Sequence, residues 1–488
     1  MRLKTKINTK NISFKKSKTK HNSKWYDLEC RSIKKRLRNL ANILNKNPNN
    51  QVARTNWFKI KKEYRKIIRD KKQSFEQESI DKLITSINEP KVFWKHAKSI
   101  SGKIGGNNSN NILASKWVEH FSALSKKDPS QLYPDNPNVI NIKNQIKDVI
   151  NEPSTKSILD KHFTINEILD GIKKLKAGKA SAHDIVSNDL IKATATTIAP
   201  ILCDLFNFII THEYVPVFWG IGMIIPLYKS GEISDTNNYR GITINSCISK
   251  LFTLIMNIRL NDYVESHNIL HYNQIGFRKG FRPADHVFTL KTMIDQAFND
   301  KEELFVCFVD FKKAYDLVWR DGLFYKLLET GFSSKFVKVM MSMYESLSSC
   351  VFLPNGLSQT FTSHVGLKQG CNLSPTLFNL FINDFISSIK DDPKSPKLGN
   401  ILINCLFYAD DLVLIANSKE DLQNLVNKLY DFSTKWFLEV NTTKTKSLVF
   451  SRKRKNKSEV NILFGNNPLP QCDSYCYLGT ISLIQISN

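Results

Sequence analysis

The sequence has little of what marks a membrane-spanning, secreted or disulfide-bonded protein. No stretch approaches 18 uninterrupted apolar residues, so we expect no membrane span. The first ten residues, MRLKTKINTK, lack the apolar core of a signal peptide. Nine cysteines are scattered along the chain, and an odd, scattered set without a leader sequence favours a reducing compartment. We therefore expect a nuclear and cytoplasmic protein.

A zinc-type cysteine cluster and an internal repeat are also missing from the sequence. Cys472 and Cys476 are separated by three residues and have no His nearby, so we interpret them as structural residues. The chain has 488 residues, of which 41% are hydrophobic. This length and composition suit two to four domains with buried cores.

Acidic residues are scarce at the start of the chain. The whole sequence has 70 Lys and Arg residues, 45 Asp and Glu residues and a net charge of +25. Residues 1–100 alone hold 28 of the basic and 8 of the acidic residues, which is +20. This asymmetry predicts a polyanionic partner, namely nucleic acid, whose binding would weaken as salt rises. A basic helix that is merely solvated is the alternative.

Apolar residues recur at helical spacing within the basic segment. We predict a disordered basic tail over residues 1–24 and a basic helical extension over residues 25–125, with helices at 25–44 and 56–87. Such helices bind RNA through its phosphates or pack as a hairpin on the rest of the protein, and the residues alone leave both interpretations open. Residues 126–160 are rich in Asn and Pro and predict a linker.

Two adjacent acids interrupt the apolar segment LFYADDLVLIA at residues 406–416. The flanking aromatic and branched residues favour two short strands, with Asp410 and Asp411 at the tip of a hairpin. Charges within such an apolar segment are costly unless something pairs with them, and a divalent cation is the natural partner. The alternative is an ordinary strand end with two solvated acids.

A second apolar run also ends in an acid. Residues 305–309 are continuously apolar, which is typical of a strand buried on both faces, and Asp310 follows directly. If the two strands are neighbours in one sheet, Asp310 converges with Asp410 and Asp411. Three carboxylates at one point can hold two Mg²⁺ ions about 3.5–4 Å apart, as in polymerases and nucleases. The sequence therefore predicts a two-metal site for Mg²⁺, where Mn²⁺ would also fit.

Seven ordered segments resemble one enzyme family. FVDFKKAYD, GLKQGCNLSPTLFNLFIND and FYADD resemble the palm motifs of reverse transcriptases. NYRGIT, QIGFRKG, NTTKTKSLVF and YLGTIS resemble the non-LTR, LINE-type retrotransposon branch, and the resemblance covers roughly residues 160–480. It implies an α/β fold with a right-hand polymerase palm and fingers, in which an antiparallel sheet is backed by helices and the basic α-helical extension comes first.

The resemblance implies that three acids carry the metals and two cations bind the incoming nucleotide. Asp310, Asp410 and Asp411 match the catalytic metal ligands. Lys229 and Arg240 match the residues that contact the triphosphate, where Lys supplies a point charge and Arg a planar fork. By composition alone, each of these two cations is merely a loop residue.

Five further residues match positions around the nucleotide. The backbone of Phe311 would help to seat the triphosphate, and Tyr315 would close the sugar pocket against a 2′-hydroxyl. Gln369 and Gly370 would line the nucleotide and template pocket. Lys444 would act as the general acid toward pyrophosphate. The alternatives are a buried core tyrosine at position 315 and a surface lysine at position 444.

The implied domains are fingers and entry segment at 161–300, palm at 301–450, and the palm end with a truncated start of the thumb at 451–488. The implied reaction is RNA-directed DNA synthesis, in which a primer 3′-hydroxyl attacks the α-phosphate of a dNTP and pyrophosphate leaves. The partners would be an RNA template, a DNA primer or target, and dNTPs. The sequence leaves the oligomeric state open.

Three other interpretations were weighed. A truncated copy would act only as a nucleic-acid-binding remnant, and the lack of most of a thumb favours it. The intact acids argue against it. An intron-encoded maturase is disfavoured by NYRGIT and YLGTIS. A two-metal nuclease would leave GLKQG and Tyr315 without a role.

Overall fold

The computed structural model divides into two compact units, residues 1–107 and 108–488, which are described separately. The structure describes residues 26–47, 50–85, 112–123, 128–152, 157–182, 184–229, 231–353, 356–389, 392–451 and 460–484. The predicted tail at residues 1–24 lies outside these ranges.

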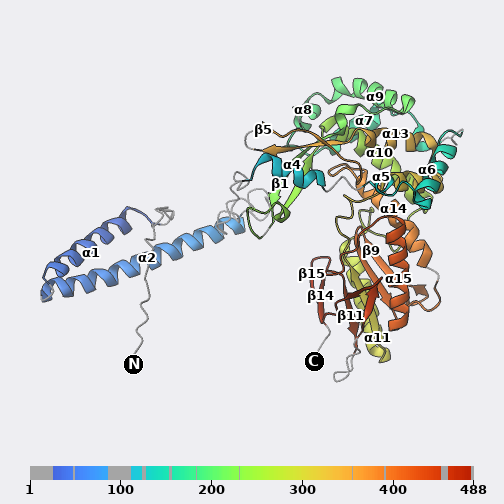
Figure 1. The fold of residues 1–488 in the computed structure, drawn as a ribbon. Coiled ribbons are helices and arrows are strands. Elements are labelled where there is room, and N and C mark those ends of the chain that lie inside the picture. Colours follow the sequence, from blue (N-terminus) through green and yellow to red (C-terminus); the bar gives the residue numbers. More distant parts are fainter. Residues whose placement is uncertain are drawn as a thin grey trace, which may run out of the picture. The chain divides into compact units, whose positions relative to one another are not determined.

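The first unit contains a pair of packed helices, α1 (Leu28–Lys46) and α2 (Gln51–Thr85) (Figure 1). The Asp27 carboxylate caps α1 by accepting from the backbone N–H of Cys30 at 3.1 Å. Lys71 of α2 reaches back to Asp27 at 2.6 Å and to Glu29 at 2.9 Å. These contacts confirm two basic helices and show that they form a hairpin with each other. RNA binding by this hairpin stays a prediction.

The second unit contains a four-stranded sheet with the order β11-β3-β10-β9. Its strands are β3 (Leu304–Val309), β9 (Cys405–Tyr408), β10 (Asp411–Ala416) and β11 (Lys446–Phe450), and all neighbours are antiparallel. This order confirms that the strand ending at Asp310 is the neighbour of the strand after Asp410.

Both faces of this sheet are buried, and alternate residues of β3 serve the two faces. Phe305, Cys307 and Val309 join the main core, which includes residues of α14 (Ser374–Ile389) and α15 (Lys419–Lys435). Leu304, Val306 and Phe308 join a second core with residues of α11 (Pro283–Asp300). Figure 1 shows α15 and α11 beside the strands. Burial on both faces explains why the β3 sequence is apolar throughout.

The second unit also contains a second sheet. It has the order β2-β1-β4-β5, from β1 (Ile221–Tyr228), β2 (Tyr239–Ile244), β4 (Ser348–Leu353) and β5 (Gly356–Leu357), and β6 (Phe361–Thr362) also pairs with β4. Helix α4 (Ala114–Ala123) covers it, since the Trp117 ring meets the Tyr239 ring edge-on at 4.8 Å between centroids. The basic extension was expected to run to residue 125, but α4 belongs to this second unit because its aromatic residues complete a core with the sheet.

The linker predicted at residues 126–160 is wrong. This segment forms α5 (Pro129–Leu132) and α6 (Pro137–Ile150), with the Asn136 side chain and Pro137 starting α6. Val139, Ile142 and Ile146 of α6 are buried in the main core. Asn and Pro act here as helix-start residues, which is why the composition resembled a linker.

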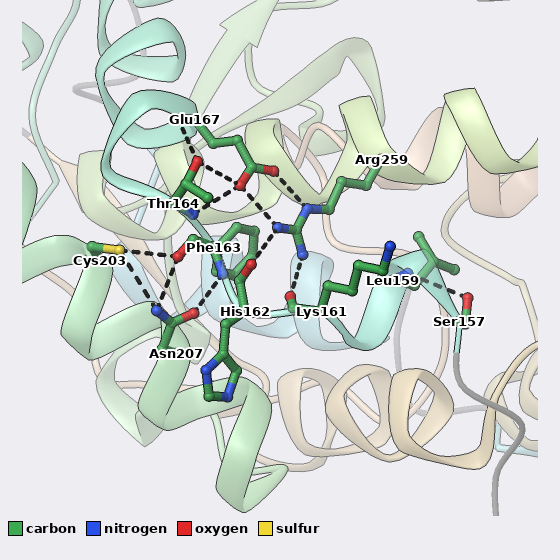
Figure 2. Close-up of polar contacts among 10 residues, drawn as sticks. All are labelled: Ser157, Leu159, Lys161, His162, Phe163, Thr164, Glu167, Cys203, Asn207 and Arg259. Atoms are coloured by element: carbon green, nitrogen blue, oxygen red, sulfur yellow. Dashed lines mark hydrogen bonds and ion pairs between the residues drawn. The ribbon is translucent and has the colours of Figure 1, made fainter.

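One buried cation, Arg259, holds the segment from Lys161 to Glu167. Arg259 of α10 (Cys247–Ser266) donates to both carboxylate oxygens of Glu167, at 2.8 and 3.0 Å, and to the backbone oxygens of Lys161 and His162 (Figure 2). Glu167 also completes a capping box at the start of α7 (Ile165–Lys174) with Thr164. Figure 2 shows this network joining α7 to α10.

The remaining helices build the core around the two sheets. They are α8 (Asn188–Ala193), α9 (Ala195–His212), α12 (Arg320–Glu329) and α13 (Ser334–Glu345). Within the described ranges, α9 is long and apolar enough to cross a membrane by length and composition alone. A core helix has the same composition, and six residues of α9 are buried.

Three two-stranded hairpins complete the unit. They are β7 (Lys397–Leu398) with β8 (Ile401–Leu402), β12 (Ile462–Phe464) with β13 (Asn467–Leu469), and β14 (Ser474–Tyr477) with β15 (Thr480–Ile484). The Tyr475 ring of β14 stacks on Phe308 of β3 at 4.2 Å between centroids. The chain between residues 474 and 477 therefore packs on the four-stranded sheet.

Candidate active site

One cavity of about 790 Å³ gathers most of the residues that the sequence singles out. It is lined from both sheets and from α4. Eight of the ten predicted site residues line it: Lys229, Arg240, Asp310, Phe311, Tyr315, Gln369, Asp410 and Lys444. Asp411 and Gly370 do not line it, although each is adjacent in the chain to a residue that does.

The β9–β10 hairpin carries Asp410 at its turn. Tyr408 pairs with Asp411, so the turn consists of Ala409 and Asp410 alone. Ala409 has φ of 59°, the left-handed conformation that glycine or asparagine usually takes in such turns. The hairpin prediction is confirmed, and the absence of glycine means that other contacts must stabilise the backbone of Ala409.

Asp310 is fixed by the segment before β11. Its backbone N–H donates to the Thr445 hydroxyl at 3.1 Å, and its backbone oxygen accepts from the N–H of Asn441 at 2.7 Å. Val309 pairs with Leu412 in the antiparallel register, and one further step sets Asp310 beside Asp411. The end of β3 thus faces the acidic turn.

The acids at this end of the sheet act on one another. Burial, together with the charge of Asp310, raises the pKa of Asp410. Partial burial and the charges of Asp410 and Asp310 raise the pKa of Asp411 to about 6. Crowded carboxylates favour a cation, because a positive charge relieves both the burial and the repulsion.

The acidic end of the sheet fits a metal that takes few protein ligands. In the part of the chain that the structure describes, no three His, Cys, Asp or Glu side chains lie close enough to hold a metal ion, so the three carboxylates expected to meet at one point do not form such a group. Mg²⁺ usually keeps several waters and binds through one or two carboxylates plus substrate phosphates. Asp310 and Asp410, both on the cavity, supply oxygen donors of that kind.

Cations line the same cavity as the acids. Lys229 and Lys444 are exposed at its rim, and the charge of the exposed Arg240 acts on both Asp410 and Asp316. Lys368 is buried, where its ammonium group donates to the backbone oxygen of Trp219. Burial lowers the pKa of Lys368 to about 8. The cavity therefore offers positive charge to an anionic ligand.

Tyr315 is both packed and exposed to the cavity. Its ring stacks on the buried Phe378 ring at 4.6 Å between centroids, and it lines the cavity. Among the described residues, its buried hydroxyl has no hydrogen-bond partner. Burial and the charges of Asp410 and Asp411 raise its pKa. The ring therefore lies near the acids and packs on the core through Phe378.

The turn at Gly366–Gly370 is joined to the segment after Asp310. Gln369 donates its side-chain N–H to the Asp316 carboxylate at 2.6 Å. Gly370 has φ of 75°, and a Cβ there would lie 2.8 Å from the backbone oxygen of Thr243. Glycine at position 370 therefore lets this turn approach β2 closely.

Asp316 and Asn245 also line the cavity, although the sequence did not single them out. Asp316 lies within the quoted segment FVDFKKAYD, and burial raises its pKa although the Gln369 amide partly offsets this. Asn245 is 1% exposed and donates to the backbone oxygen of Gln369 at 2.8 Å. No local pattern marks Asn245, because its partner is 124 residues away.

Phe311 is buried at the back of the cavity, where it forms an isolated antiparallel bridge with Val440. The next backbone N–H, that of Lys312, donates to the oxygen of Glu439 at 2.7 Å. The backbone after Asp310 is thereby tied to the segment that leads to Lys444.

These features define a mixed α/β protein whose acid-tipped strands face a cation-lined cavity. Within that class, the chain belongs to the reverse transcriptase (RNA-dependent DNA polymerase) family, whose model matches residues 228–481.

Three curated relatives from Drosophila melanogaster illustrate the similarity. The chain is 26% identical over 450 residues to the "Probable RNA-directed DNA polymerase from transposon BS", covering 87% of this chain and 47% of that protein. It is 25% identical to the corresponding X-element protein, over 64% of this chain and 34% of that one. It is 24% identical to the Pol polyprotein of the type-2 retrotransposable element R2DM, over 68% and 32%. The chain spans less than half the length of each.

Proposed function

We propose that the protein is the RNA-directed DNA polymerase of a non-LTR retrotransposon. The observation that carries the proposal is the single cavity lined by Asp310 and Asp410 and also by Lys229 and Arg240. Carboxylates and cations that share one cavity suit phosphoryl transfer, where catalysis consists of positioning and charge stabilisation. Family membership and the names of the relatives support the same activity.

In this proposal, the four-stranded sheet is the polymerase palm and the β1–β2 sheet belongs to the fingers. Asp310 and Asp410 would hold divalent ions, Mg²⁺ in the first place, with Asp411 supporting them. When bound, such ions neutralise charge on the phosphates and lower the pKa of the attacking hydroxyl. The template would be RNA, the primer DNA, and the substrates dNTPs.

The chain's own side chains bind and orient the nucleotide. Lys229 and Arg240 would hold the triphosphate, and Gln369, fixed by Asp316, would face the base pair that forms. Tyr315 would pack against the sugar. Lys444, exposed at the rim, would donate a proton to the departing pyrophosphate.

Primer extension by the full chain tests the proposal. The assay uses an oligo(dT) primer on poly(rA) with dTTP and Mg²⁺, and products are separated by length. We expect extension that stops when EDTA removes the metal. A chain that binds the primed template and never extends it would instead be the nucleic-acid-binding remnant, and the polymerase proposal would be rejected.

A further inference from the structure

The turn that carries Asp410 is held by hydrogen bonds to a side chain from a distant part of the sequence. Gln274 lies between α10 and α11 and is fully buried. Its side-chain oxygen accepts from the backbone N–H of Ala409 at 3.1 Å, and its side-chain N–H donates to the backbone oxygen of Ala409 at 3.3 Å. One amide thus satisfies both backbone groups of the residue before Asp410.

These two hydrogen bonds are made to Ala409, the residue of the turn with a positive φ. Ala409 has φ of 59°, a left-handed conformation that is unfavourable for a residue with a Cβ. Neither turn residue is a glycine, so the residues of the turn do not favour this conformation by themselves. The two hydrogen bonds from Gln274 recognise the backbone of Ala409 in that conformation and hold it there.

The backbone around Gln274 is itself docked on β9. The N–H of Ile275 donates to the oxygen of Phe407 at 3.1 Å, and the N–H of Phe407 donates to the oxygen of Asn273 at 2.8 Å. Gln274 forms a parallel bridge with Phe407. These contacts fix where the Gln274 amide lies relative to the hairpin.

Gly276 allows the segment that carries Gln274 to lie close to the backbone of Ala409. A Cβ at Gly276 would lie 2.2 Å from the backbone nitrogen of Ala409, so no side chain fits there. The N–H of Gly276 donates to the Gln274 side-chain oxygen at 3.0 Å, which orients the amide. The buried Asn379 donates to the oxygen of Gly276 at 2.7 Å.

We propose that Gln274 is a positioning residue that sets the direction of Asp410. It touches neither the nucleotide nor the metal ligands in this scheme; it acts through the backbone of Ala409. The inference rests on the proposed function for its catalytic consequence, whereas its effect on the turn is independent of any activity.

The test compares the full chain with Gln274→Met, Gly276→Ala and Asn404→Leu. Met preserves the volume of Gln274 and removes both hydrogen bonds, and Ala at position 276 presses directly on the turn. Asn404 is the matched control, because it is an equally buried amide whose side chain donates to Ile389 and Ser395 and not to the turn.

The first readout is hydrogen–deuterium exchange of the peptide that covers residues 405–412, measured without metal or substrate. We expect Gln274→Met and Gly276→Ala to lose protection in this peptide, and Asn404→Leu to keep it. The melting temperature of each variant shows how far the whole fold is affected.

The second readout is primer extension at saturating metal. We expect kcat to fall about 100-fold in Gln274→Met, since a small misplacement of a reacting group costs that much, while KM for dTTP and binding of primed RNA stay close to wild type. Wild-type protection and kcat in Gln274→Met would overturn the inference. A wild-type chain without any extension would refute the polymerase proposal alone, because the exchange experiment still decides whether Gln274 holds the turn.

Discussion

At the scale of single residues, Tyr315 shows how one side chain serves the core and the cavity together. Its ring leans on Phe378 and borders the space beside the acids. A deoxynucleotide has only hydrogen at the 2′ carbon, so the ring can pack against it. A ribonucleotide places a hydroxyl there, which clashes or loses its water at a cost on the order of 2–4 kcal/mol.

Replacing Tyr315 by Val is therefore expected to admit ribonucleotides. The ratio of kcat/KM for dNTP over rNTP falls tens to several hundredfold, because the missing ring accounts for that free energy. Tyr315→Phe is the control and keeps the ratio, since the hydroxyl has no hydrogen-bond partner among the residues that the structure describes. Single-nucleotide extension measures both. An unchanged ratio in Tyr315→Val, with both rates falling together, would mean that Tyr315 only packs.

At the scale of elements, the Arg259 network explains how the entry segment is fixed to α10. Partial burial alone would raise the pKa of Glu167, but hydrogen bonds from Arg259 and Thr164 outweigh burial and lower it below its ordinary value of 4.5. Glu167 thus stabilises the fold above that pH, and this contribution is lost as the pH falls through the lowered value.

Arg259→Met should lower the free energy of unfolding by about 3 kcal/mol at pH 7, because it strands a carboxylate and two backbone oxygens. Denaturant unfolding at several pH values measures this loss, which should shrink below pH 4.5 as Glu167 becomes protonated. The exposed pair of Lys173 and Asp170 gives the control, and Lys173→Met should change stability by less than about 0.5 kcal/mol. A loss for Arg259→Met that is the same at every pH would show that Glu167 does not share in the network's stability.

Elements with a local signal were predictable, and those that depend on distant contacts were not. The apolar run of β3, the acid-tipped hairpin and the Ser418 cap of α15 follow from neighbouring residues. Helix α6 was not predicted, because Asn136 and Pro137 are typical of a linker. Its apolar residues, such as Val139, are buried only through contacts with distant parts of the chain. The contacts of Gln274 and Asn245 span more than 120 residues, and no local pattern encodes them.

At the scale of the whole molecule, the second unit brings residues from 229 to 444 to one cavity. The sequence indicated which residues matter because the resemblance supplied their order, and the structure adds which of them share a space. Residues of both sheets line that space. Asp310 and Asp410 belong to the ends of β3 and the β9–β10 turn, and Lys229 and Arg240 belong to the β1–β2 part of the other sheet. We expect Asp310 and Asp410 to act there as one unit.

A double-mutant cycle on primer extension tests this claim most directly. The rate of first-nucleotide addition is measured for wild type, Asp310→Asn, Asp410→Asn and the double variant, with Asp295→Asn on the exposed face of α11 as the control. If the two carboxylates hold the same ions, each single variant loses on the order of 10³-fold and the double variant loses no more than either. A double loss equal to the product of the two single losses would show that the two acids act separately, and would contradict the account.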